Sequence, residues 1–258
     1  MAKVYFIGAG PGDPELITVK GARLLREAEV VIYAGSMVDL GLVRSYAPDA
    51  VVWDSSGMTL EETVVVIADA VASGKPVVRL HTGDPSIYGS IQEQMAVLDD
   101  LGIAYEVVPG VTSAFAAAAL LGQELTLPEV SQTVIFTRME GKTPVPEREH
   151  LSTIAGIGAT LVIYLSVVMI DRVVAELLKG GYNPETPAAV VSRVSWPDEQ
   201  VVQGSLAEIA AKTRDAGIDK QALIIVGDVL KARSEGMKAR SLLYDGRFTH
   251  SFRKGVVT

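Results

Sequence analysis

Short apolar runs alternate with longer mixed stretches along the first half of the chain. The apolar runs predict buried strands at residues 4–7, 30–33, 76–80 and 105–108. The stretches between them predict helices at residues 16–28, 59–72, 90–101 and 113–121. Thr59 and Glu62 have the spacing of a capping box, and Gly74 is a helix stop. Apolar strands that alternate with helices indicate a mainly parallel sheet covered on both faces.

The pattern lapses after residue 122 and then resumes. Further strands are predicted at residues 133–137, 160–165, 188–193, 200–203 and 222–226, and helices at 168–179 and 205–216. We therefore expect an α/β protein of two α/β domains with mainly parallel or mixed sheets and an active-site cleft between them. The predicted boundaries are an N-terminal domain at 1–122, a linker at 123–131, a C-terminal domain at 132–240 and an irregular tail at 241–258.

Composition and charge remove several classes of function. The 258 residues carry a formal net charge of −8, whereas a general nucleic-acid binder has a basic footprint. The chain has no cysteine and only three scattered histidines, so we expect no disulfide, no thiolate site and no metal centre. No apolar stretch of roughly 18 residues is present, and we expect a cytoplasmic protein with no membrane partner.

The glycine-rich sequence GAGPGD at residues 8–13 follows the first predicted strand. A dinucleotide fingerprint needs a third glycine where this chain has Asp13. Pro11 also removes an N–H that a pyrophosphate would need, and no acidic residue ends the second strand. These three departures exclude NAD or FAD at this turn. A tight turn that shapes the edge of the sheet remains the alternative.

Two more glycine-bearing loops follow predicted strands, HTGDPSIYGS at residues 81–90 and VPGVTSAFAA at residues 108–117. Ligands collect at the carboxyl ends of parallel strands. Each loop alone is also a routine turn or helix start, with Asp84, Thr112 or Ser113 as ordinary capping residues. Three such loops at three strand ends favour one shared cleft.

Taken together, GAGPGD, TGDPSIYG and PGVTSA resemble the tetrapyrrole methyltransferases that use S-adenosylmethionine. The resemblance covers essentially the whole chain, since TLVIYLS, PAAVVSRVSWPDEQVVQGSL and ALIIVGDV resemble segments of the same family. YAGSMV, DSSGMTLEE and TRMEGKTPVPE are similar to the branch that methylates carbon 11 of the corrin precursor precorrin-4. Uroporphyrinogen-III methyltransferases carry an aspartate after the tyrosine of the second strand, where this chain has Ala34, Gly35 and Ser36. An acid role at that position is therefore not carried over.

The resemblance implies that S-adenosylmethionine lies folded between the domains and is held largely by backbone. The implied cofactor contacts are Pro11, Thr82, Gly83, Asp84, Ile87, Thr112, Ser113, Leu165, Ala189 and Val194. Candidate contacts to an anionic tetrapyrrole substrate are Gly10, Tyr33, Ser36, Tyr88, Arg138, Met139 and Lys142. Core packing is the alternative for the apolar members of this set.

Basic side chains should line the cleft, because the implied substrate carries many carboxylates. Arg138, Lys142 and Arg148 are candidates, since the arginine fork suits a carboxylate. Acidic residues interleave with them, so a self-paired, solvated loop is the alternative. Methyl transfer from a sulfonium to carbon depends mainly on positioning, and no residue is assigned as a general base.

Other functions stay open on the sequence alone. They are methylation of another macrocycle position, methylation of a protein or RNA with the same cofactor, and a non-catalytic tetrapyrrole- or cofactor-binding module. A dehydrogenase is a distant alternative. The family suggests a homodimer, and the sequence does not decide whether the substrate already carries cobalt.

Overall fold

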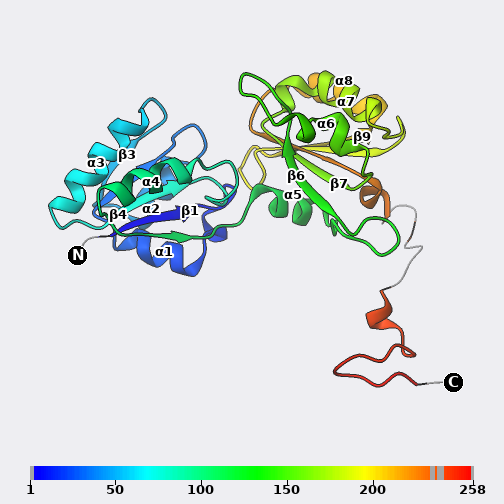
Figure 1. The fold of residues 1–258 in the computed structure, drawn as a ribbon, viewed down its shortest axis with the longest axis horizontal. Helices are drawn as coiled ribbons and strands as arrows, with labels where there is room; N and C mark the ends of the chain where they lie inside the picture. Colours follow the sequence, from blue (N-terminus) through cyan, green and yellow to red (C-terminus); the bar gives the residue numbers. More distant parts are fainter. Residues whose placement is uncertain (1–2, 233–235, 237–240, 257–258) are drawn as a thin grey trace. The chain divides into compact units, whose positions relative to one another are not determined.

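The computed structural model describes residues 3–232, 236 and 241–256 (Figure 1). Short stretches of the predicted domains and of the predicted tail lie outside the described residues. They are residues 1–2, 233–235, 237–240 and 257–258. The chain forms two compact units. The first unit is Met1–Ala116 with Arg193–Glu199, and the second is Ala117–Ser192 with Gln200–Thr258.

The first unit is a five-stranded parallel sheet with helices on both faces. Its strands lie in the order β3-β2-β4-β1-β5, and each neighbouring pair is parallel. The strands are β1 (Val4–Gly8), β2 (Val30–Tyr33), β3 (Val51–Asp54), β4 (Val77–His81) and β5 (Tyr105–Val108). The helices are η1 (Pro14–Leu16, 3-10), α1 (Val19–Arg26), α2 (Leu40–Tyr46), α3 (Leu60–Ala72) and α4 (Ile91–Asp100).

Two apolar clusters hold these helices to opposite faces of the sheet (Figure 1). Leu25 of α1 and Leu42 of α2 pack against Ile7 and Leu80 on one face. Ile67 of α3 and Leu98 of α4 pack on the other face. Each fully buried side chain of this size contributes about 1.5–3 kcal/mol. The alternation of apolar side chains along β1 and β4 therefore fixes which helices cover which face.

Most of the predicted elements of the first unit are confirmed, and two were missed. The capping box is present: Thr59 Oγ1 accepts the Glu62 N–H at 3.2 Å, and Glu62 Oε2 accepts the Thr59 N–H at 2.8 Å. Helix α2 and strand β3 were not predicted. Strand β3 is a short edge strand whose Val51 and Trp53 are half exposed, so it lacks the fully buried apolar run that the prediction relied on.

The second unit is a mixed five-stranded sheet in the order β6-β7-β10-β8-β9. Strands β6 and β7 are parallel, and the pairs β7–β10, β10–β8 and β8–β9 are antiparallel. The predicted α/β class with a parallel and a mixed sheet is confirmed. The strands are β6 (Val134–Arg138), β7 (Thr160–Tyr164), β8 (Pro187–Ser192), β9 (Gln200–Ser205) and β10 (Ala222–Val226). The helices are α5 (Ser113–Leu121), which spans the division between the units, η2 (Glu147–Glu149), α6 (Leu151–Ala155), η3 (Val167–Met169), α7 (Ile170–Lys179), α8 (Leu206–Asp215) and η4 (Asp228–Lys231).

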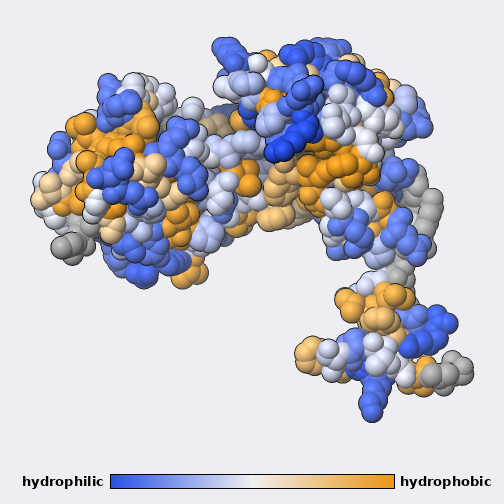
Figure 2. All heavy atoms as spheres, in the orientation of Figure 1, coloured by the Kyte–Doolittle hydropathy of each residue, from blue (hydrophilic) through white to orange (hydrophobic). Residues whose placement is uncertain are grey.

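Residues 241–256 form a small hydrogen-bonded segment that begins with η5 (Leu242–Tyr244). The Arg253 guanidinium donates to the carbonyls of Leu243 and Asp245 at 2.8 and 2.6 Å. This segment presents hydrophobic side chains on its surface (Figure 2), and the exposed residues include Leu242, Leu243 and Phe252. In the part of the chain that the structure describes, no helix is both long and apolar enough to cross a membrane.

Candidate functional site

The carboxyl edge of the first sheet has the topology of a ligand site. Adjacent strands β1 and β4 send the chain to opposite faces, since α1 packs on one face and α4 on the other. In open α/β sheets, ligands bind outside the strand ends at such a switch point. The loops that follow β1, β4 and β5 all start at this edge.

These three loops contact one another through their main chains. Gly10 and Gly83 form a bridge in which the Gly10 N–H donates to Gly83 O at 3.3 Å and the Gly83 N–H donates to Gly10 O at 2.8 Å. A Cβ added to Gly8 would lie 2.5 Å from Gly83 O, and one added to Gly110 would lie 2.0 Å from the same oxygen. Only glycine fits at residues 8 and 110, because backbone occupies the space of a side chain. The glycines of the three predicted loops thus build one surface.

Asp84 links two of the loops. Its Oδ1 accepts the Ser86 N–H at 2.8 Å, and its Oδ2 accepts the Gly110 N–H at 2.9 Å. The first bond is the turn interaction that the sequence analysis gave as the alternative role of Asp84. The second joins the loop after β4 to the loop after β5, which no sequence pattern indicated. Asp84 therefore shapes the edge through both carboxylate oxygens.

A buried polar cluster, which the sequence analysis missed, lies directly before the Thr82–Asp84 stretch. The Arg79 guanidinium donates to Gln94 Oε1 at 3.2 Å and to Ile32 O at 3.3 Å. Burial lowers the pKa of Arg79 to about 10. Burial, with the Arg79 charge, lowers the pKa of His81 to about 3, so this imidazole is neutral. The sequence did contain an indication of this cluster, because Arg79 and His81 alternate with apolar residues in a buried strand.

Asp54 joins the two loops at the other side of the sheet. Its Oδ1 accepts the N–H groups of Gly35 and Ser56, both at 2.9 Å. These backbone bonds hold the pKa of the Asp54 carboxyl below its ordinary value. Burial, with the Asp54 and Asp39 charges, raises the pKa of the Tyr33 phenol. Of the substrate candidates here, Tyr33 is buried in the core, whereas Ser36 is exposed.

The remaining candidates of the first unit lie on the loops already described. Tyr88 is 46% exposed and has a left-handed φ of 56°. Pro11, Gly83 and Thr112 are buried, whereas Thr82, Ile87 and Ser113 are partly exposed. Val194 is buried within the Arg193–Glu199 segment, which belongs to the first unit.

In the second unit, side chains close the ends of β6 and β7. Ser166 Oγ accepts the Met139 N–H at 2.8 Å and donates to Tyr164 O at 2.6 Å. Leu165 lies between Tyr164 and Ser166 in the sequence. It has a left-handed φ of 53°, and 63% of its surface is exposed. A non-glycine residue in that region is strained, and such strain clusters at functional sites. The Met139 side chain, by contrast, is packed in the core, which was its alternative role.

Ala189 does not share this edge with Leu165. It lies in the middle of β8, paired with Ile225 of β10 and Gln203 of β9. Its side chain is buried. The register places it level with Val162 of β7, three residues before Leu165.

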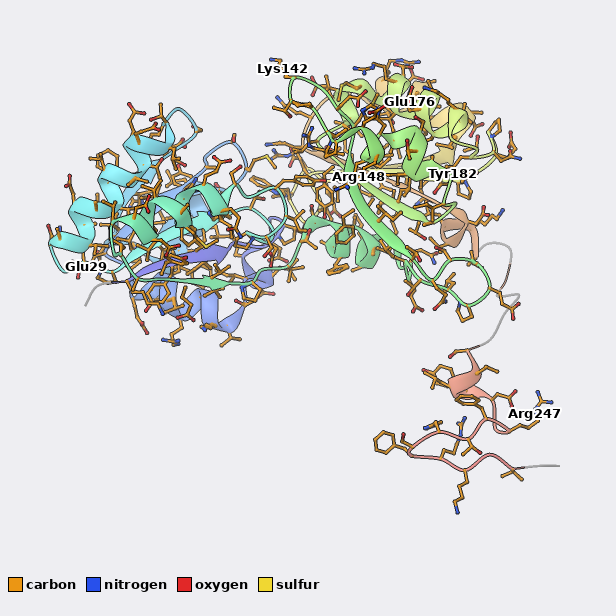
Figure 3. The ribbon with its side chains drawn as sticks, in the orientation of Figure 1. Glu29, Lys142, Arg148, Glu176, Tyr182 and Arg247 are labelled. Carbon is orange, nitrogen blue, oxygen red and sulfur yellow. The ribbon has the colours of Figure 1, made fainter. Side chains whose placement is uncertain are left out.

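The basic loop after β6 is largely self-paired. The Arg138 guanidinium donates to the carbonyls of Met139, Thr143 and Pro144, so it holds its own loop together. Arg148 lies 3.7 Å from a Glu149 carboxylate oxygen. Lys142 is exposed on the same loop (Figure 3). The alternative of a solvated, self-paired loop therefore accounts for Arg138 and Arg148.

The edge of the first sheet fits the cofactor that the resemblance implies. S-adenosylmethionine carries amino, carboxylate, hydroxyl and adenine groups, which need both donors and acceptors. The loops bring closely packed glycines together with the hydroxyls of Thr82 and Ser113, which can both donate and accept. Within residues 3–232, 236 and 241–256, no cluster of three or more His, Cys, Asp or Glu could hold a metal ion.

Comparisons with known proteins identify similar sequences. Residues 3–210 match the family described as Tetrapyrrole (Corrin/Porphyrin) Methylases. The chain is 55% identical to the cobalt-precorrin-4 C(11)-methyltransferase of Methanocaldococcus jannaschii, over 98% of this chain and 96% of that protein. It is 49% identical to the precorrin-4 C(11)-methyltransferase of Pseudomonas aeruginosa, over 98% and 99% of the two chains.

Two solved structures are similar to the fold. An X-ray structure of the cobalamin biosynthetic enzyme cobalt precorrin-4 methyltransferase is 48% identical, with a TM-score of 0.86, and the match covers 88% of this chain and 95% of that chain. Uroporphyrin-III C-methyltransferase from Thermus thermophilus, in complex with S-adenosylhomocysteine, is 33% identical, with a TM-score of 0.76. That match covers 90% of this chain and 100% of that chain.

Proposed function

The chain belongs to the tetrapyrrole (corrin/porphyrin) methylase family, and from this premise we propose that it transfers a methyl group from S-adenosylmethionine to carbon 11 of precorrin-4 or cobalt-precorrin-4. One observation carries the proposal: relatives with this activity in their names are 49% and 55% identical over nearly the whole chain. The reaction belongs to cobalamin biosynthesis. A cytoplasmic homodimer is part of the same proposal, and sedimentation of the purified protein tests the dimer.

S-adenosylmethionine supplies an activated methyl group on a sulfonium. The task of the chain is then to orient the donor and the acceptor carbon, which can contribute on the order of 7–11 kcal/mol. The glycine-built edge suits that task, because its main chain is fixed by the Gly10–Gly83 bridge and by Asp84. Fixed main-chain groups lose little entropy when a ligand binds them.

The proposed cofactor contacts on the first unit lie on the loops after β1, β4 and β5 and on the Arg193–Glu199 segment. They are Pro11, Thr82, Gly83, Asp84, Ile87, Thr112, Ser113 and Val194. Leu165 is the proposed contact from the second unit, because the residue is exposed and its left-handed φ is strained, as at many functional sites. Ala189 rests on the resemblance alone.

The proposed substrate contacts are the exposed Ser36, Tyr88 and Lys142, together with the main chain of Gly10. The Lys142 ammonium is suited to a peripheral carboxylate of the macrocycle. Lys142→Ala should raise KM for the macrocycle about twofold to fivefold, the effect of one exposed ion pair. Lys220→Ala, which removes an exposed lysine from another loop, is the control and should leave KM unchanged. Equal KM values for both variants would remove Lys142 from the site.

The decisive experiment is incubation with S-adenosylmethionine labelled with ¹³C in the methyl group. Precorrin-4 and its cobalt complex are supplied in parallel, and NMR locates the new methyl carbon. Labelling of carbon 11 supports the proposal, and the faster of the two substrates answers the cobalt question. A label on another carbon identifies a different methyltransferase. Cofactor binding without any methyl transfer identifies a binding module.

A further inference from the structure

The segment Arg193–Glu199 forms a rigid turn in the first unit. Arg193 and Ser195 both have left-handed φ values, of 47° and 63°. The Arg193 guanidinium stacks on the Trp196 ring at 4.2 Å from its centroid and pairs with Asp198 at 2.7 Å. The Ser195 N–H donates to Glu199 Oε2 at 2.8 Å. The stacking on the Trp196 ring and the ion pair with Asp198 thus hold Arg193 and Ser195 in strained backbone conformations.

This turn contacts the glycine-rich turn after β1 at three successive residues, Pro11, Gly12 and Asp13. The Trp196 indole N–H donates to Pro11 O at 2.9 Å. The Asp13 N–H donates to Ser195 Oγ, also at 2.9 Å. Between these bonds, the indole lies against Gly12 so closely that an added Cβ would be 2.3 Å from its Cδ1 atom. The contacts therefore fix a carbonyl, an α-carbon and an amide of one short turn.

The glycine-rich turn is part of the proposed cofactor edge. Gly10 forms the bridge to Gly83, and Pro11 is a proposed cofactor contact. The Pro11 carbonyl would otherwise be free to rotate, since glycine residues flank the proline on both sides. Preorganising a main-chain group improves affinity because the ordering cost is met before the ligand arrives.

We infer that Trp196 and Ser195 are positioning residues that hold residues 11–13 in the conformation that receives S-adenosylmethionine. This inference rests on the proposed function. The turn orients the cofactor in the ground state and in the transition state alike. Loosening it therefore raises the dissociation constant and KM for the cofactor and leaves kcat at saturation nearly unchanged. A merely structural role would instead lower the fraction of folded enzyme and hence kcat.

The test uses the full chain and S-adenosylhomocysteine as the calorimetric ligand. Trp196→Phe keeps an aromatic ring but removes the N–H donor together with part of the indole, and Ser195→Ala removes the other hydrogen bond. Each should weaken binding about threefold to tenfold, the equivalent of one net hydrogen bond. Trp196→Ala should weaken it further. Trp53→Phe is the matched control, because Trp53 is 43% exposed on the edge strand β3, and it should bind like wild type.

The same control gives a second measurement. The chain has 2 tryptophans, so Trp53→Phe leaves Trp196 as the single indole fluorophore. The Trp196 emission should change during titration with S-adenosylhomocysteine. The midpoint of this change should equal the midpoint measured by calorimetry. Wild-type affinity in both Trp196→Phe and Ser195→Ala overturns the inference and leaves the proposed function standing. A wild-type protein that does not bind S-adenosylhomocysteine overturns both.

Discussion

The strand ends of the two sheets are held together by different groups, backbone contacts at glycines in one and a side-chain hydroxyl in the other. In the first unit, the end of β1 at Gly8 and the loops after β4 and β5 meet backbone to backbone, at Gly83 and Gly110. In the second unit, the ends of β6 and β7 are closed by side chains, with Ser166 bonded to both. At the first edge, glycines let the backbones approach directly, whereas at the second edge a side-chain hydroxyl joins the two strand ends. The two edges should therefore be sensitive to different substitutions.

The largest effect should follow from a single methyl group in the glycine edge. In Gly110→Ala, the new Cβ would lie 2.0 Å from Gly83 O and 2.7 Å from the Gly8 Cα. Both neighbours are backbone atoms of buried glycines, so the backbones must separate. We expect a loss of at least about 3 kcal/mol in the free energy of unfolding, the upper part of the overpacking range. Urea denaturation measures it.

Gly57→Ala is the matched control for this experiment. Gly57 has no heavy atom within 4 Å of an added Cβ. Its substitution should change the free energy of unfolding by less than about 1 kcal/mol. Similar losses in the two variants would contradict the steric account of the edge.

A side-chain deletion should be the most damaging change at the second edge. Ser166→Ala leaves the buried Met139 N–H and Tyr164 carbonyl without their hydroxyl partner. Unsatisfied buried groups cost about 1–3 kcal/mol, so the urea midpoint should fall accordingly. Ser73→Ala, which removes one exposed bond to Asp69 O, should be nearly neutral. If the two serines cost the same, side-chain closure of the edge is wrong.

Asp84→Ala tests a side chain that joins two loops of the glycine edge. It removes the acceptor of the Gly110 and Ser86 N–H groups and so unlinks two loops. Affinity for S-adenosylhomocysteine should fall about tenfold, equal to about 1.4 kcal/mol. Asp84→Asn keeps one oxygen acceptor and should lie between this variant and the wild type. Unchanged affinity and turnover in Asp84→Ala would remove the residue from the site.

The smallest effect should come from Glu106, which lies near the amino end of β5 and away from the glycine edge. Hydrogen bonds from Lys20 and Lys3 lower the pKa of Glu106 to about 2, from an ordinary 4.5. A depressed carboxyl pKa stabilises the fold above pH 4.5, and this contribution is lost as pH falls towards 2. Glu106→Gln should therefore lower the melting temperature slightly at pH 7 and less at pH 3. Its affinity for S-adenosylhomocysteine should equal that of the wild type, and a gap in melting temperature that widens in acid would refute the pairing.

The parts of the molecule that were predictable are those with local causes. The helix at Leu60–Ala72 begins at a capping box and ends at Gly74, which has a φ of +76°. The buried strands were predicted because each is an apolar run. Strand β3 was missed because an edge strand exposes Val51 and Trp53 to solvent. Glycine spacing predicted the first edge, since residues 8, 83 and 110 follow strands that come to lie side by side.

Contacts between distant residues carry no local pattern, and these were missed. Trp196 contacts Pro11 across 185 positions of the sequence, and no contact between its segment and the glycine-rich turn was predicted. Arg138 was a candidate for binding a carboxylate, with a self-paired loop as the alternative, and its guanidinium donates to carbonyls of its own loop. A basic residue in a loop does not disclose whether its partner is a ligand or the neighbouring backbone. Only the packed structure separates these cases.

The fit between Gly12 and Trp196 also constrains how the chain can change over generations. No side chain can enter at residue 12 while an indole occupies the space 2.3 Å from its Cβ position. A small residue at 196 would have to arise first, and that step gives up the bond to Pro11. The two sites are therefore epistatic, and the order in which mutations occur decides which are accepted.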